Sequence, residues 1–559
     1  MATVSAMEES LLATSEHDLD RRGGRPVNKA LATAWKSSLF IIGVEVAERM
    51  TYYGIGSNLI TYLINVLHQS TATAAKNVNI WSGVTATLPF LGAFLADAYW
   101  GRYRTIVASS IVYLLGLTLL TASVSFKFLR PPPCIYTSSS CSEATPVQNG
   151  LFFCSLYLIA LGTGGHKPCI EAFGADQFDG EDPEENRYRS SFFNWWYFGQ
   201  CFGALIALTV LLYVEDYIGW GVGFGIPTVA MALALSLFLY GSKFYRHQVI
   251  FSSPLNGQKT VPDTEVGELL VNKSRTKLTH TDQFRSLDKG CPEKSAHDAV
   301  LSAKEVNLFA RLIPIWVTCL MYGVVFAQCS TFFTKQGSTM DRKIIGHIEI
   351  PPASLQCFIA LSILVLVPVY DWIFVPLAKT FTGLEHGITV LQRVGFGIFV
   401  SVLAMVVAAL TELKRLKVAK DNGLVDLPTA TIPMTIFWLL PQYILYGISE
   451  VFAMVGMQEY FYDQMPNRMR SLGIAVFLSV LGIGSFLSGI VISIVDEISS
   501  RSKEGSWFQD NLNTAHLDYF YWLLAALSAL NLCLYIYFSS CCNVTKLEER
   551  IFVYEEVVN

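Results

Sequence analysis

Residues 38–65 read SLFIIGVEVAERMTYYGIGSNLITYLIN, an apolar run that contains three charged residues, Glu45, Glu48 and Arg49. A helix of this length is long enough to cross the hydrocarbon core of a bilayer, which is about 30 Å thick. A charged side chain near the centre of such a helix costs about 3 kcal/mol on insertion scales, so it normally faces a cavity and is paired. The stretch therefore predicts a transmembrane helix that carries a functional charge cluster.

The whole chain is poor in charge for its size. Its 559 residues are 52% hydrophobic and 15% charged, and its mean hydropathy is +0.41. Soluble domains carry about 25% charged residues, so this composition indicates a membrane protein. The net charge of −5 does not suggest a nucleic-acid partner. Long unbroken apolar runs argue against the alternating segments of a β-barrel, so we expect an all-α membrane protein.

Apolar segments recur along nearly the whole chain and predict about twelve transmembrane helices in two six-helix halves. The expected spans lie near 38–65, 80–99, 105–126, 149–170, 191–213, 220–241, 305–332, 354–375, 388–411, 433–460, 471–495 and 518–539. The expected regions are a tail, 1–36, a six-helix bundle, 37–242, a polar linker, 243–304, a second six-helix bundle, 305–540, and a tail, 541–559. Asp97 follows the second span and Asp371 the eighth, which suggests repeated halves, the usual build of secondary transporters.

The first 35 residues contain no apolar segment of the signal-peptide kind, so we expect both tails and the central linker in the cytoplasm. Arg102 and Arg104, after the second span, agree with this topology. The basic stretch 414–420 disagrees, because an even number of spans places it on the opposite side. Cys134 and Cys141 share a loop predicted to lie outside the cytoplasm, where they are either bridged or free.

Glu45, Glu48 and Arg49 are three or four residues apart, so they share one helical face. Two carboxylates and one guanidinium leave one excess negative charge, which in a cavity of low dielectric favours reversible binding of a proton by a glutamate. The alternative is a static ion-pair cluster that holds helices together. Lys167 in the fourth span is a candidate partner of the glutamates. Glu450 in the tenth span has no basic neighbour within one helical turn, so it is either protonated or awaits a ligand.

The sequence contains no catalytic or metal-binding motif of the common kinds. It has no GxSxG, no HExxH and no GxxxxGK[ST] phosphate loop, and its twelve cysteines include no CxxC pair. We therefore expect a protein that is not an enzyme and that binds no metal or other cofactor, with protons as the coupling ion.

Several blocks resemble those of the plant nitrate/peptide transporter family, part of the proton-dependent oligopeptide transporters of the major facilitator superfamily. The first block is Glu45-x-x-Glu48-Arg49 followed by Tyr52-Tyr53-Gly54. The others are residues 92–103, 173–179, 191–197 and 459–466, so the resemblance covers essentially the whole chain. It implies the major facilitator fold.

The resemblance also implies roles for individual residues. Glu45, Glu48 and Arg49 match the family's proton-coupling motif, and Lys167 matches the fourth-helix lysine that pairs with it. The residues of the loop motif, expected to act in gating, are Asp97, Gly101 and Arg102. The residues that we expect to line the substrate cavity are Tyr53, Cys201, Phe326, Gln328, Ser330, Trp438 and Glu450.

Departures from the family pattern bear on the substrate. Cys201 stands where many relatives have an asparagine that contacts peptide, although Glu450 matches the glutamate that holds the peptide amino terminus. Phe326 stands where a nitrate-transporting relative has a histidine, and Ser330 where it has a threonine. The sequence thus predicts a proton-coupled secondary transporter of nitrate, a small peptide or a plant metabolite, working by alternating access. The alternative is a membrane sensor on a transporter fold that signals through the central linker.

The expected partners are a small-molecule or anion substrate and the lipid bilayer, with no nucleic acid and with kinase regulation of the cytoplasmic segments left open. The Gly199-Gln200-Cys201 variant resembles a plant subgroup that includes vacuolar-membrane nitrate carriers. We therefore expect a multi-pass protein of the vacuolar or the plasma membrane.

Overall fold

The structure is a computed structural model that describes residues 27–132, 144–178, 183–246, 312–344, 349–382, 388–428, 430–465, 470–501 and 505–558. Contacts divide the chain into two units. One unit comprises Met1–Gln248 and Ile315–Asn559 and contains both predicted six-helix halves. Of the other unit, Val249–Pro314, the structure describes residues 312–314. Of the predicted linker, 243–304, it describes residues 243–246, and the rest lies outside the described residues.

The described elements are helical except for two short strands. Those of the N-terminal half are α2 (Val27–Asn65), α3 (Thr71–Thr87), α4 (Pro89–Leu95), η2 (Ala96–Trp100), α5 (Arg102–Ser125), η3 (Lys127–Leu129), α6 (Pro146–Ala175), α7 (Pro183–Ile206), η4 (Ala207–Leu211), η5 (Val214–Ile218) and α8 (Trp220–Gly241). Those of the C-terminal half are the helix Leu312–Phe326, α11 (Phe332–Ser338), β1 (Met340–Asp341), η7 (Pro352–Gln356), α12 (Cys357–Val369), η8 (Tyr370–Phe374), α13 (Val375–Thr382), α14 (Val390–Asp421), β2 (Ile432–Thr435), η9 (Ile436–Leu439), α15 (Leu440–Asp463), α16 (Arg470–Ser500) and α17 (Leu517–Val558). The strands β1 and β2 pair in parallel.

The prediction of about twelve spans is confirmed. Ten helices in the described residues are long and apolar enough to cross a membrane, and a shorter apolar helix, Leu312–Phe326, coincides with the seventh predicted span. The twelfth is α2, in which Glu45, Glu48 and Arg49 lower the apolar character of the central turns. Each predicted interval therefore contains one apolar helical span, which in some cases is made of consecutive helical segments.

The boundaries of some spans differ from those predicted. α3 begins at Thr71, where the Ser70 side chain caps it by accepting a hydrogen bond from Thr73 N. The prediction placed this span nine residues later, because Lys76 and Asn79 lower the hydropathy of the first turns. α17 continues to Val558, through the predicted C-terminal tail.

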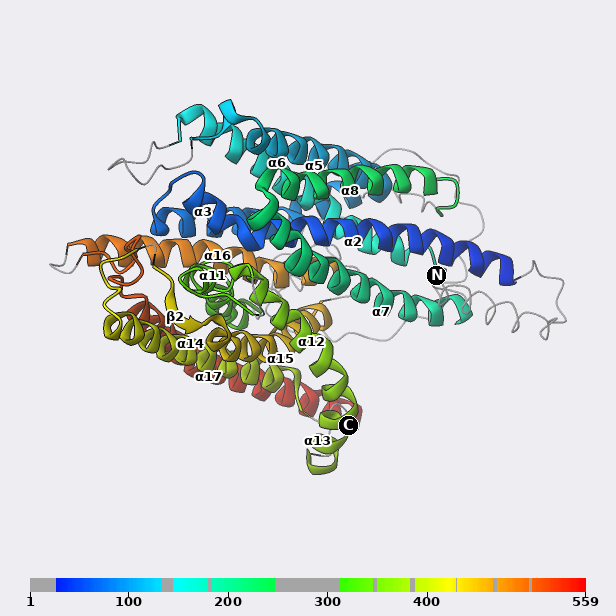
Figure 1. Cartoon of the computed structure of the whole chain (residues 1–559). Coiled ribbons are helices and arrows are strands. Elements are labelled where there is room, and N and C mark those ends of the chain that lie inside the picture. Colours follow the sequence, from blue (N-terminus) through cyan, green and yellow to red (C-terminus); the bar gives the residue numbers. More distant parts are fainter. Residues whose placement is uncertain are drawn as a thin grey trace, which may run out of the picture. The chain divides into compact units, whose positions relative to one another are not determined.

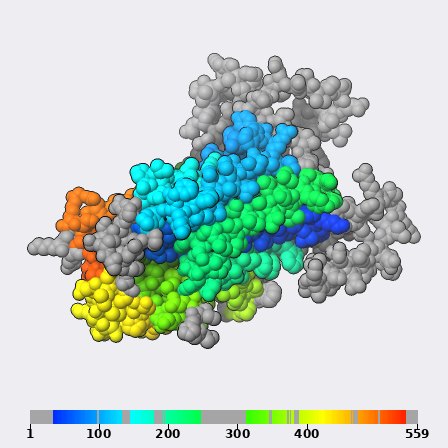
Figure 2. Space-filling view, turned by 45° about the horizontal axis from the view of Figure 1, so that its top comes forward, coloured from blue at the N-terminus to red at the C-terminus, as the bar shows by residue number. Residues whose placement is uncertain are grey.

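Helices within each half pack closely through glycines. α5 and α6 meet where a Cβ on Gly162 would clash with the backbone of Tyr113, and α14 and α15 meet where a Cβ on Gly397 would clash with Ala453. Figure 1 shows α5 and α6 next to each other, and α14 beside α15 and α17. In the space-filling view, helices of the N-terminal half cover one face of this unit, with part of the C-terminal half below them (Figure 2).

The two halves share a local irregularity that supports the predicted repeat. Asp97 lies in η2 and Asp371 in η8, and both segments are π-helical turns of five residues. Each follows an apolar helix, α4 in the first half and α12 in the second. The N-terminal half also contains the π-helical turns η4 and η5, so the match between η2 and η8 agrees with repeated halves without establishing them.

The halves contact each other at the end of the bundle where α2 ends and α3 begins, called here the α2–α3 end. Asn79 of α3 donates a hydrogen bond to Ser488 Oγ of α16 at 3.0 Å, and Gln328 donates to the same hydroxyl at 3.0 Å. Lys76 Nζ lies 3.0 Å from Asp496 Oδ2. These contacts close the α2–α3 end.

The basic stretch that conflicted with the predicted topology has a structural explanation. Arg415 is fully buried, with its Nη2 2.5 Å from Glu412 Oε1 and its Nη1 2.9 Å from Asn513 Oδ1. Lys414 Nζ lies 3.1 Å from the centre of the Trp438 ring. Two of the basic residues therefore bind protein groups, and they do not serve as free loop charges of the kind that set orientation.

We expect Arg415→Met to lower the stability of the folded protein by about 3 to 5 kcal/mol, because it leaves the Glu412 carboxylate buried without its cation. Thermal unfolding of the purified protein in detergent measures this as a lower midpoint. Lys417→Met, on the same helix but exposed, is the matched control and should leave the midpoint unchanged. Equal midpoints for the two variants would contradict the structural role of Arg415.

Candidate functional site

The charged residues of α2 form a buried cluster. Arg49 Nε lies 3.0 Å from Glu45 Oε1, and a terminal nitrogen of Arg49 contacts Glu48. Glu45 and Glu48 are 1% and 0% exposed, and Arg49 is 5% exposed. Glu45 Oε2 and Glu48 Oε1 accept no hydrogen bond from the described residues. One guanidinium thus faces two carboxylates in dry surroundings, as the spacing predicted.

Lys167 lies near this cluster but not in an ion pair with it. Its Nζ is 5.7 Å from the centre of the Tyr52 ring, and the Arg49 guanidinium carbon is 5.5 Å from the same ring. No carboxylate of the described residues lies within 4.0 Å of Lys167, although the charges of Glu45 and Glu48 act on it. The pairing implied by the resemblance is absent from this state, because Arg49 already binds both glutamates.

Two further ionisable groups on α6 belong to this region. Glu171 is one turn beyond Lys167, and its charge acts on both Lys167 and Glu45. Glu171 was not predicted, although its i, i+4 spacing from Lys167 is a signal in the sequence that could have identified it. His166 is fully buried, and neither ring nitrogen has a hydrogen-bond partner among the described residues.

A second group of residues surrounds Glu450 on α15. This carboxylate accepts no hydrogen bond within the described part of the chain and is partly exposed. Its charge acts on Tyr53 of α2 and Cys201 of α7 in the N-terminal half, and on Tyr322 and Tyr446 in the C-terminal half. Glu450 therefore lies where the two halves face each other, between predominantly aromatic walls.

The rings next to Glu450 stack on one another. Tyr446 lies 5.9 Å from Tyr322 and 5.9 Å from Phe326, measured between ring centres. Tyr446 precedes Glu450 by four residues, and Tyr322 precedes Phe326 by four, so each pair shares a helical face. Phe326 was predicted for the cavity wall, whereas the two tyrosines were missed.

The remaining predicted cavity residues, Ser330, Gln328 and Trp438, lie in different parts of the C-terminal half. Ser330 is partly exposed in the turn that precedes α11. Gln328 is fully buried and donates to Val324 O and to Ser488 Oγ, so it joins helices at the α2–α3 end. Trp438 lies in η9, is 46% exposed and contacts the Lys414 ammonium. It is twelve residues before Glu450, so the structure does not bring these two predicted cavity residues together.

The predicted loop motif connects α4 with α5. Gly101 has φ 79°, in the region that favours glycine, and it ends η2 immediately before α5. Arg102 Nη1 lies 2.5 Å from Asp176 Oδ2 at the end of α6, which ties α5 to α6. The side chain of Asp97, and the residues Cys134 and Cys141, lie outside the described part of the structure.

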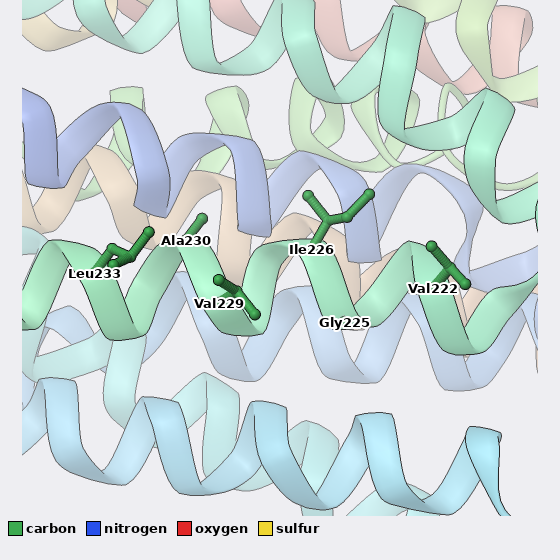
Figure 3. A pocket seen from close by; sticks show the side chains of 6 residues that line it. All are labelled: Val222, Gly225, Ile226, Val229, Ala230 and Leu233. Carbon is green, nitrogen blue, oxygen red and sulfur yellow. The ribbon is translucent and has the colours of Figure 1, made fainter.

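The outer face of α8 carries a groove lined by apolar residues alone. Figure 3 shows these side chains along the helix, and they are Val222, Gly225, Ile226, Val229, Ala230 and Leu233. Val229 and Leu233 are 60% and 66% exposed. A groove without a polar group suits lipid chains, so it is not the solute site.

Two halves of membrane-spanning helices, with ionisable side chains facing the interior, define a multi-pass transporter. The comparisons with known proteins agree. The model of the POT family matches residues 103–508, and the chain belongs to this family of membrane transporters.

Relatives and solved structures support this assignment. The Arabidopsis thaliana protein NRT1/PTR family 5.10 is 52% identical over 92% of this chain and 94% of its own length. Protein NRT1/PTR family 5.14 of the same plant is 46% identical over 96% and 97%. The structure of the POT family transporter PepTSo has a TM-score of 0.65 and 22% identity, and the match covers 90% of this chain and 97% of that one. The chain thus has the fold of POT transporters and its relatives are plant NRT1/PTR proteins.

Proposed function

We propose that the protein is a proton-coupled secondary transporter that works by alternating access. In this proposal Glu45, Glu48, Arg49 and Lys167 carry the proton coupling, with a glutamate as the group that binds and releases the proton, and Glu450 holds the solute. The observation that carries the proposal is the pair of buried carboxylates around one guanidinium in the middle of α2.

The charge balance supports proton binding at the α2 cluster. Burying an unpaired carboxylate in a medium of low dielectric is costly, and one proton removes the excess charge. Each proton that crosses the membrane supplies about 2.3 kcal/mol per 100 mV of potential, in addition to the pH gradient. No other coupling ion is needed to drive accumulation.

The position of Lys167 supports a two-state mechanism. Lys167 rests over Tyr52 in this state, while Arg49 binds both glutamates. A change in the protonation of a glutamate alters its attraction for Lys167, and Lys167 is on α6 whereas the glutamates are on α2. Proton binding then biases the contact between these helices, which is the element that a population shift requires.

The surroundings of Glu450 support a solute that carries an amino or other cationic group, such as a small peptide or an amine-bearing metabolite. The carboxylate has no cationic partner among the described residues, and the aromatic rings around it favour a cation. Solved POT transporters hold 5-aminolevulinic acid and a thioalcohol-conjugated peptide.

Nitrate is the second candidate. The observation in its favour is Lys167, which makes no ion pair within 4.0 Å among the described residues and is partly exposed. An anion could bind there while Glu450 is protonated. Phe326 packs on Tyr446 and offers no hydrogen bond to such an anion.

The protein lies in the vacuolar or the plasma membrane, and both of its termini are in the cytoplasm. The closed α2–α3 end then faces the vacuole lumen or the cell exterior, and this state opens toward the cytoplasm. Burial of Arg415 removes one objection to this orientation.

We expect Glu48→Gln to abolish proton-driven accumulation, because glutamine cannot exchange a proton. In oocytes exposed to a panel of nitrate, dipeptides, plant hormones and glycosides, the wild type should give a current with at least one solute at acidic pH, and the variant none. The variant should still reach the membrane and exchange that solute between the two sides. If a pH gradient drove the variant to accumulate the solute at the wild-type rate, the coupling assignment would be contradicted.

We expect Glu450→Gln to weaken binding of an amine-bearing solute by about 10- to 100-fold, which corresponds to the loss of a charge-assisted hydrogen bond worth about 1.5 to 3 kcal/mol. The half-saturating concentration of the dipeptides in the panel measures this. The matched control is Glu459→Gln, on the same helix but 3.3 Å from Arg393. If Glu450→Gln alters nitrate currents and no others, nitrate is the solute and the amine assignment fails.

A further inference from the structure

A second pair of carboxylates lies near the α2–α3 end, apart from the sites described above, and it consists of a buried Glu215 and a partly exposed Asp216. Glu215 and Asp216 are neighbours in η5, the π-helical turn that precedes α8. The side-chain amide of Asn58, on α2, donates to both of them, at 3.1 Å to Glu215 Oε2 and 2.9 Å to Asp216 Oδ1. Asn58 is ten residues beyond Glu48, or about 15 Å along the helix axis. The two clusters are therefore separate.

The group is enclosed by helix backbone. Glu215 is 1% exposed and Asn58 is 0% exposed. A Cβ on Gly223 of α8 would clash with the Glu215 side chain, and a Cβ on Gly54 of α2 would lie 3.9 Å from its Oε1. The absence of a side chain at Gly223 makes the space that Glu215 occupies, whereas Gly54 makes room for Leu211 beside it.

Hydrogen bonding within this group is incomplete. Glu215 Oε1 and Asn58 Oδ1 are both buried acceptors to which no described residue donates. The amide of Asn58 has two hydrogens, and one carboxylate receives each of them. The group therefore has more buried acceptors than donors, and a bound proton would supply one.

The surrounding charges do not balance two carboxylates. The titratable and charged groups that face the pair are Tyr217, Arg342 and Glu349. Arg342 Nη2 lies 3.3 Å from Glu349 Oε2, and its charge acts on Asp216 without forming an ion pair with it. Among the described residues, no lysine or arginine lies within 4.0 Å of Glu215. Two adjacent carboxylates in such surroundings cannot both stay ionised without a large cost.

We propose that Glu215 and Asp216 share one bound proton, at a second proton site distinct from Glu45 and Glu48. Such a proton makes one carboxyl group a donor and leaves the other as an acceptor. The ligand is a proton and not a metal ion, because Glu215 is 1% exposed and Gly223 packs against its side chain, which leaves no room there for the several oxygen ligands that a cation needs.

The location of this group gives the proton a defined exchange route. Tyr217, the next residue, donates to Glu349 at 3.4 Å and accepts from Arg342 at 3.5 Å, so the N-terminal half meets the C-terminal half there. These contacts cover the pair while the α2–α3 end is closed. The proton therefore exchanges with water when that end opens, and the site reports the state of that end.

Infrared difference spectroscopy of the purified full-length protein in lipid nanodiscs tests the proposal, and it needs no transported solute. A protonated carboxylic acid has a carbonyl stretch that a carboxylate lacks. We expect the wild type to show this band at neutral pH, and Glu215→Gln and Asp216→Asn each to lose or shift one band. Glu349→Gln, a partly exposed carboxylate at the same end, and Glu48→Gln should retain that band.

Two results would overturn the proposal. One is a spectrum in which neither Glu215→Gln nor Asp216→Asn changes a carboxylic acid band. The other is a band that disappears when sodium replaces choline in the buffer, since the group would then bind a cation. Because two variants at different residues report on the same proton, misfolding of one variant leaves the other as a valid test.

The spectroscopic test and the accumulation test are independent. An unchanged spectrum would not contradict the proposed transport function, and accumulation by Glu48→Gln would not contradict the proton site at Glu215 and Asp216.

Discussion

The ion pairs that Arg49 makes with Glu45 and Glu48 are the interaction on which the rest of the structure depends. Three charges in the middle of α2 are tolerated in a bilayer only if other helices surround them. α3, α6, α7 and α8 all contact α2, and they shield the cluster from lipid. The packing of the N-terminal half around α2 therefore encloses this cluster.

The C-terminal half contains a buried ion pair of a different kind. The positive charge of Arg415 balances the negative charge of Glu412. The guanidinium also donates to Asn513 Oδ1 and to the carbonyl of Leu512, and Gln336 donates to Glu412. The charges of this network balance and its carboxylate accepts hydrogen bonds from both Arg415 and Gln336, so the network holds α14 to its neighbours. The α2 cluster differs from this network, because it has two carboxylates for one guanidinium, and Glu45 Oε2 and Glu48 Oε1 accept no hydrogen bond from the described residues.

Much of this architecture could be predicted from the sequence. The length of the apolar runs located the twelve spans, and the i, i+4 spacing of Glu45 and Arg49 predicted their ion pair. Side chains that interact across helices far apart in the chain could not be predicted. The spacing of Glu412 and Arg415 is a local signal for their ion pair, but the burial of Arg415 depends on Asn513 and Leu512, about 100 residues later in the chain, and could not be predicted. For the same reason Trp438 was assigned to the cavity, although it packs under Lys414.

α2 contains no proline along its 39 residues, unlike α6, α8 and α12, which contain Pro168, Pro227 and Pro368. A proline-free helix of this length bends little, so it behaves as a lever with Glu48 near its middle and Asn58 near one end. A small tilt of α2 about its centre moves Asn58 further than it moves Glu48. The side-chain amide of Asn58 donates to Glu215 and Asp216 in η5. One continuous helix thus carries both the Glu45–Glu48–Arg49 cluster and the asparagine that binds the pair in η5.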